Sequence, residues 1–188
     1  MEFIAALWLP ILLSAIGVFV VSSILHMATP MHKADYKKLG KEKEVLAAMR
    51  ELGVVPGEYM FPACDAMKDM ATPEYQDRCK LGPVGHMVVL PNGIWNMNKS
   101  LLQWFAFTVV VGIFVAYITD LALPQGSAFS TVFRFAGTAA TMSYALGVVP
   151  NSIWKGISWT TTGKFLIDGL LYGLTTGAIF AWLWPSAV

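Results

Sequence analysis

Three histidines and two cysteines are the side chains of this sequence best suited to binding a metal ion. They are His26, His32, Cys64, Cys79 and His86. Thiolate with imidazole suits zinc, and the methionine thioethers of the same stretch suit Cu(I). However, no Cys-x-x-Cys pair is present, and Pro30 interrupts the run between His26 and His32. Methionine is also an ordinary filler of irregular cores, so copper or zinc handling is an alternative and not the leading interpretation.

Charged residues within apolar segments form a second candidate group, because an ionisable side chain in a membrane helix is a functional hypothesis by default. Asp120 and Arg134 flank a short connector, which predicts an ion pair near one membrane surface. Lys164 and Asp168 are four residues apart, which predicts a second pair on one helix face. A small oligomeric transporter or channel would instead turn Asp120, Arg134 or Asp168 toward a water-filled cavity.

Small residues recur at the spacing that lets membrane helices approach closely. Gly169, Gly173 and Gly177 form a double G-x-x-x-G, and Gly112 with Ala116 forms a similar face. These residues predict helix–helix interfaces, either within the chain or with another subunit.

No catalytic constellation is recognisable. The sequence contains no G-x-S-x-G, H-E-x-x-H or G-x-G-x-x-G motif. The stretch from Gly156 to Lys164 has six residues between its glycines, where a phosphate-binding loop has four. We therefore predict neither an enzyme activity nor a cofactor.

The composition is that of a membrane protein, with 56% hydrophobic and 13% charged residues and a mean hydropathy of +0.57. A net charge of +1 argues against nucleic-acid binding. The predicted fold is all-α, an antiparallel bundle of four transmembrane helices joined by short connectors. A small, mainly helical polar subdomain at residues 26–100 separates the first two helices. The four apolar segments are residues 3–25, 101–123, 129–149 and 164–184.

The polar subdomain carries its own local signals. Residues 41–52 predict a soluble helix with an apolar stripe, and Thr72-Pro73 and Gly82-Pro83 predict the two ends of another. Residues 86–90 allow one short strand or hairpin. Pro150 predicts the end of the third apolar helix, with a loop at 151–163.

The positions of the basic residues predict an orientation. Residues 26–100 hold 10 of the 13 lysines and arginines, and both termini hold none. The positive-inside rule therefore places residues 26–100 in the cytoplasm and both termini outside. Cys64 and Cys79 would then stay reduced, whereas the opposite orientation would favour a disulfide.

Several short runs resemble small uncharacterised bacterial four-helix membrane proteins. They are Pro91-Asn-Gly, Asn98-Lys-Ser-Leu-Leu-Gln-Trp-Phe, Asn151-Ser-Ile-Trp and Asp168-Gly-Leu-Leu-Tyr-Gly. The resemblance implies a bacterial inner-membrane location and no particular chemistry. A polar subdomain of this size is marginally stable alone. The leading interpretation is therefore a structural or accessory subunit that contacts lipid and other membrane subunits, or further copies of itself.

Overall fold

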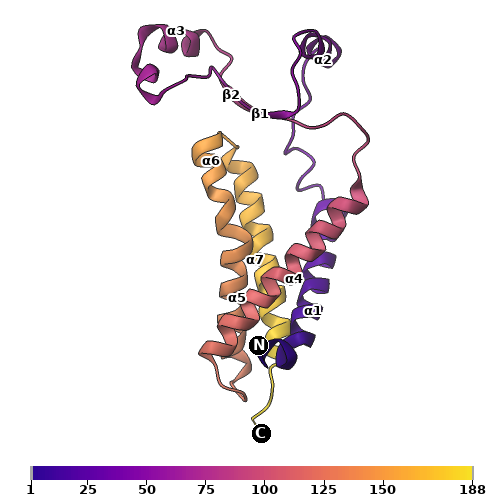
Figure 1. Ribbon diagram of the computed structural model, residues 1–188. Helices are drawn as coiled ribbons and strands as arrows, with labels where there is room; N and C mark the ends of the chain where they lie inside the picture. The colour runs from indigo at the N-terminus through magenta and orange to yellow at the C-terminus, as the bar shows by residue number, and fades with distance from the viewer. Residues whose placement is uncertain (1, 188) are drawn as a thin grey trace.

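The computed structural model describes residues 2–187 and is mostly helical. Four of its helical segments are long and apolar enough to span a membrane, which confirms the four expected apolar helices. The chain termini lie at one end of these helices, and the polar segment lies beyond the other end (Figure 1). The four segments are Glu2–Ala28, Met97–Ala122, Phe129–Lys155 and Trp159–Trp182.

The first of these segments changes its helical type before it ends. Helix α1 (Glu2–Ser23) continues as a π-helical turn, η1 (Ile24–Ala28), and therefore extends beyond the expected end at residue 25. Thr29 closes the turn, because its N–H donates to the Ile24 carbonyl at 3.2 Å and its hydroxyl to the Leu25 carbonyl at 2.5 Å. A π-turn of this kind occurs frequently at functional sites.

Side-chain caps start two of the helices earlier than the hydropathy predicts. Helix α4 (Met97–Ala122) begins at residue 97 and not 101, because the Asn96 side chain accepts from the Lys99 N–H at 3.0 Å. Helix α7 (Trp159–Trp182) begins at residue 159 and not 164, because the Ser158 hydroxyl accepts from the Thr161 N–H at 3.1 Å. Both caps satisfy backbone donors that would otherwise be unpaired.

The prediction that Pro150 ends the third apolar helix is wrong. Helix α5 (Phe129–Ala145) passes through a short 3-10 turn, η3 (Leu146–Val148), into α6 (Val149–Lys155). Pro150 lies in the first turn of α6, where a helix does not need the backbone N–H that proline lacks. Gly156, with φ +69°, ends the helix instead.

The polar segment between α1 and α4 combines short helices with one β-hairpin. The elements are α2 (Glu42–Glu51), β1 (Gly57–Phe61), η2 (Met67–Ala71), α3 (Pro73–Leu81) and β2 (Gly85–Val89). Thr72 caps α3 and Gly82 ends it, as expected, and β1 pairs antiparallel with β2 so that Tyr59 faces Met87. Figure 1 shows α2 and α3 extending apart from the hairpin, beyond the ends of the long helices.

This polar segment has no core of its own. From residue 23 to residue 107, no residue is buried. The stripe expected on residues 41–52 is not a core face, since Leu52 is 79% exposed. The buried apolar residues lie in the long helices instead, for example Leu7, Val115, Val132 and Phe180.

Small residues set the closest helix packing, which joins α5 to α7. A Cβ atom built on Gly177 would lie 2.8 Å from the Gly137 Cα and 2.8 Å from the Phe133 carbonyl oxygen. One built on Gly169 would lie 2.6 Å from the Ala145 Cβ. The Gly169–Gly173–Gly177 face therefore packs within the chain. Gly112 and the fully buried Ala116 lie on α4, where Gly112 contacts α1.

Candidate functional site

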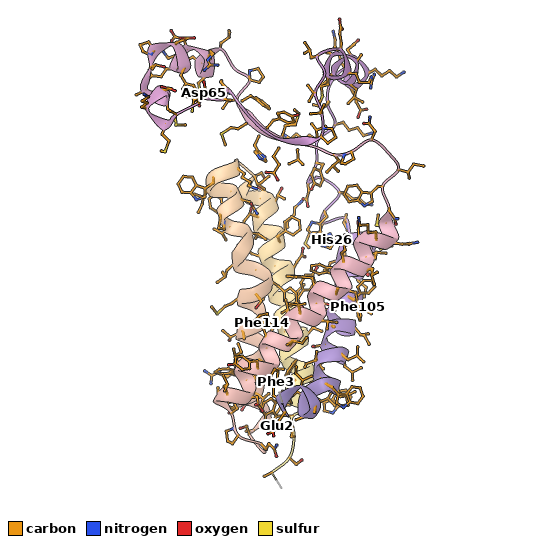
Figure 2. All side chains as sticks on the ribbon, in the orientation of Figure 1. Glu2, Phe3, His26, Asp65, Phe105 and Phe114 are labelled. Carbon is orange, nitrogen blue, oxygen red and sulfur yellow. The ribbon has the colours of Figure 1, made fainter. Side chains whose placement is uncertain are left out.

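Five ionisable side chains meet at the end of the long helices that is nearer the polar segment. We call them the His–Asp cluster: His26, His32, Asp35, Lys164 and Asp168. His26 comes from the π-turn η1, as Figure 2 shows, and Lys164 and Asp168 come from the first half of α7. His32 and Asp35 belong to the connector that follows Pro30.

One carboxylate oxygen of Asp168 lies near both imidazoles. Its Oδ2 is 3.0 Å from the His32 Nε2 and 3.4 Å from the His26 Nε2. The two imidazole rings stack with their centroids 4.0 Å apart. One donor atom from each of these three residues lies within 4.8 Å of the other two, which makes them the residues able to hold a metal ion together.

Asp35 and Lys164 hold His32 from its other side. The His32 Nδ1 lies 2.6 Å from the Asp35 Oδ2, and the Lys164 Nζ donates to the Asp35 Oδ1 at 2.5 Å. Burial raises the pKa of Asp35, but hydrogen bonds from Lys164 and then His32 outweigh it, and the net pKa is lowered. Asp35 is therefore an anionic acceptor that fixes the ring of His32.

The centre of the cluster is dry and incompletely hydrogen-bonded. The side chain of Asp168 is 2% exposed and that of His32 is 9% exposed. Within residues 2–187, the His32 Nε2 and both Asp168 carboxylate oxygens have no hydrogen-bond partner, although the Nε2 lies only 3.0 Å from the Asp168 Oδ2. The Phe165 ring, 5.2 Å from that of His32, adds an apolar neighbour. A buried carboxylate without a partner is costly, so the geometry requires a proton or a cation here.

The predicted pair between Lys164 and Asp168 is wrong, because each side chain contacts the connector instead. Lys164 binds Asp35, and Asp168 faces the histidines. Asp35 was not among the predicted site residues, and Asp168 was not predicted to contact histidine. The sequence signal for both contacts was the three-residue spacing from His32 to Asp35, soon after the first apolar helix.

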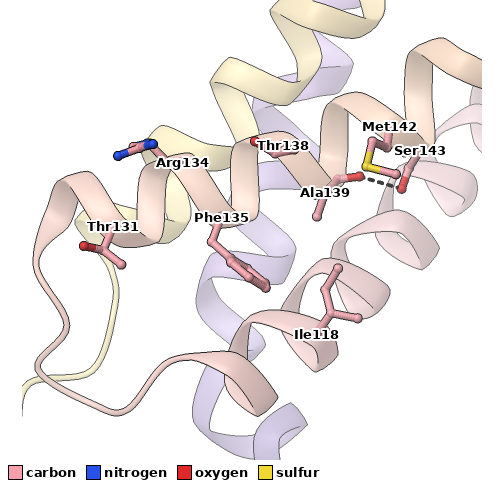
Figure 3. A pocket seen from close by; sticks show the side chains of 8 residues that line it. All are labelled: Ile118, Thr131, Arg134, Phe135, Thr138, Ala139, Met142 and Ser143. Carbon is pink, nitrogen blue, oxygen red and sulfur yellow. Dashed lines mark hydrogen bonds between the residues drawn. The ribbon is translucent and has the colours of Figure 1, made fainter.

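The predicted pair between Asp120 and Arg134 is also not formed, since the two side chains are not within ion-pair distance of each other among the described residues. Arg134 lies beside a pocket of about 700 Å³ between α4 and α5 (Figure 3). The pocket is lined by Ile118, Thr131, Arg134, Phe135, Thr138, Ala139, Met142 and Ser143.

The remaining metal candidates are not part of the cluster. His86 lies on β2, with its Nε2 3.8 Å from a carboxylate oxygen of Glu58 on β1. Cys64 and Cys79 are free thiols on the polar segment. Of the five predicted metal ligands, the structure brings together His26 and His32, and adds Asp168.

Comparison with known proteins identifies no family for this chain. No protein-family model, no curated protein and no solved structure matches it.

Proposed function

We propose that this chain is a multi-pass protein of a bacterial inner membrane that acts as an accessory subunit of a membrane protein assembly. Its four long helices form an antiparallel transmembrane bundle, and residues 29–96 attach it to a partner protein on the cytoplasmic side. The location of both termini at one end supports the bundle, because an even number of spans returns the chain to its starting side (Figure 1).

The observation that carries this proposal is the exposure of apolar side chains on a folded segment without a core. Ordering a chain costs about 1–2 kcal/mol of backbone conformational entropy per residue. Buried apolar surface normally offsets that cost, but residues 29–96 contain no buried apolar residue. Four apolar side chains illustrate the exposure: Leu52 at 79%, Met67 at 86%, Leu81 at 88% and Ile94 at 100%. A further surface must therefore cover this segment.

Charge favours a protein over the lipid surface as the covering partner. A segment held on an anionic bilayer carries an excess of lysine and arginine. Residues 29–96 instead carry nine basic and nine acidic residues. Exposed apolar side chains interspersed with charges of both signs are typical of a protein–protein interface with a polar rim.

Photo-crosslinking in living cells tests the proposal. A benzophenone amino acid replaces Leu52, Met67 or Leu81, one at a time, in the protein expressed at its native level. We expect a discrete adduct with one other protein from each position. The same photo-residue at Phe114, which is 64% exposed on the apolar helix α4, is the control and should give no such adduct.

A second substitution shows whether the adduct reports the proposed surface. Leu81→Asp should abolish the adduct formed from position 67, because a charge would then lie in the covered apolar surface. Adducts only with further copies of this chain, or no discrete adduct from any position, would overturn the accessory-subunit proposal.

The transporter alternative receives less support. It expects Asp120, Arg134 or Asp168 to face a water-filled cavity. The side chain of Asp168 is 2% exposed, and Asp120 is exposed but does not line the pocket between α4 and α5. Arg134 borders the pocket between α4 and α5, whose lining is mainly apolar.

A further inference from the structure

We propose that the His–Asp cluster binds a divalent transition-metal ion, for which zinc is the best match. The ligands are the Nε2 atoms of His26 and His32 and the carboxylate of Asp168. This site is independent of the accessory-subunit role, because it lies at the end of the long helices and uses none of the exposed apolar side chains.

The separations of the ligand atoms fit one shared ion. Zinc lies about 2.0–2.1 Å from imidazole nitrogen and carboxylate oxygen, so neighbouring ligands of a tetrahedral ion are about 3.3 Å apart. The Asp168 Oδ2 is 3.0 Å from the His32 Nε2 and 3.4 Å from the His26 Nε2. All three donor atoms lie within 4.8 Å of one another. Because the two imidazole rings are stacked with their centroids 4.0 Å apart, at least one ring must rotate before both Nε2 atoms can bind the same ion.

The hydrogen bond between His32 and Asp35 determines which ring nitrogen of His32 can bind a metal ion. Since a carboxylate oxygen of Asp35 lies 2.6 Å from Nδ1, we assign the ring proton to Nδ1. The Nε2 atom, 3.0 Å from the Asp168 Oδ2, then has a lone pair available for a metal ion. A carboxylate that orients a metal-binding histidine in this way is a recurrent feature of zinc sites.

Two acceptors that lie close together in a buried site need a proton or a cation between them. The His32 Nε2 and both Asp168 oxygens have no hydrogen-bond partner within the part of the chain that the structure describes. A doubly protonated His32 would be the competing explanation. It would place one N–H 3.0 Å from the Asp168 Oδ2, whereas a metal ion would also use the His26 Nε2, which lies 3.4 Å from the same oxygen.

The donor types select the class of ion. Two imidazoles disfavour Ca²⁺ and Mg²⁺, which prefer oxygen ligands throughout. The absence of a thiol or thioether among the three ligands disfavours Cu(I). Three protein ligands leave the fourth position of a tetrahedral zinc ion open for water or a partner group.

Metal titration of the full-length protein in detergent tests the site. After removal of bound metal with a chelator, we expect the protein to bind one Zn²⁺ per chain by isothermal titration calorimetry and mass spectrometry. Co²⁺ in place of Zn²⁺ should give the visible absorption spectrum of a tetrahedral site. If the unsubstituted protein binds neither ion stoichiometrically, the proposal is overturned and the protonated His32 explains the cluster.

Variants locate the ion. His32→Ala and Asp168→Asn should each weaken Zn²⁺ binding at least 100-fold, and Asp35→Asn about 10–100-fold, because it only orients a ligand. His86→Ala is the matched control and should bind Zn²⁺ unchanged. Circular dichroism and gel filtration confirm that each variant is folded. Zinc binding that is the same in His32→Ala, Asp168→Asn and the unsubstituted protein would place the ion elsewhere and overturn the assignment.

Discussion

Gly177 shows how much one residue contributes to the packing of α5 on α7. The G-x-x-x-G spacing predicted a close helix approach, and the structure places that approach inside the chain, with Gly177 against Gly137. Spacing alone could not identify the partner face, because small residues on α4 and α5 are equally able to receive it.

Gly177→Ala should destabilise the bundle. The added methyl group would meet backbone atoms of Phe133 and Gly137 at 2.8 Å, and backbone cannot move aside as a flexible side chain can. Overpacking of this kind costs about 1–3 kcal/mol, measurable by unfolding in mixed micelles. Gly163→Ala in the same helix is the control, since nothing lies within 4 Å of its Cβ position. A Gly177→Ala protein as stable as the Gly163→Ala protein would contradict the packing argument.

The contacts within the His–Asp cluster could not be predicted from the sequence. The four-residue spacing of Lys164 and Asp168 predicts a pair only from neighbours on one helix. It takes no account of side chains that other segments of the folded chain bring into contact. Asp35 is 129 residues before Lys164 and competes successfully for its ammonium group. Only the folded position of the connector reveals this exchange of partners.

At the scale of elements, both ends of α3 were predicted correctly, whereas the starts of α4 and α7 and the end of α6 were not. Thr72 and Gly82 carried recognisable signals and delimit α3 as expected. Pro150 led to a wrong prediction of a helix end, because proline disrupts the interior of a helix but fits its first turn. The π-turn η1 had no sequence signal, although it carries His26.

The connector that follows η1 is held to α7 chiefly through Asp35 and Lys164, and Lys164→Met should release it. Methionine keeps the length of the side chain but removes the charge, which leaves Asp35 with one partner fewer in a nearly buried position. In metal-free protein, we expect backbone hydrogen exchange of residues 29–40 to accelerate about tenfold or more. A tenfold change corresponds to a loss of about 1.4 kcal/mol in the free energy of local opening.

Lys155→Met provides the comparison, because Lys155 is exposed at the end of α6. It should leave the exchange of residues 29–40 unchanged, and the long helices should stay protected in both variants. Equal exchange of the connector in Lys164→Met and the unsubstituted protein would show that other contacts hold it.

At the scale of the whole molecule, the sequence predicted the four apolar helices but not the open form of the polar segment. Hydropathy identifies apolar helices because each is a long continuous signal. The apolar residues of 41–52 suggested a small core, but packing depends on whether another element meets them, and here none does. A local pattern cannot reveal whether another element of the chain covers an apolar stripe.

The orientation of the whole chain can be tested with its own cysteines. Cys64 and Cys79 are the only two thiols, they are free, and the proposed topology places them in the cytoplasm. A membrane-impermeant maleimide should therefore leave the protein unlabelled in intact bacterial spheroplasts and label it after permeabilisation. A variant with both cysteines changed to serine and Ser186→Cys should behave oppositely, because residue 186 is exposed beyond the end of α7, near the C-terminus. Labelling of Cys64 or Cys79 in intact spheroplasts would reverse the orientation. It would also move the surface of residues 29–96 to the outside, where an extracytoplasmic partner would have to cover it.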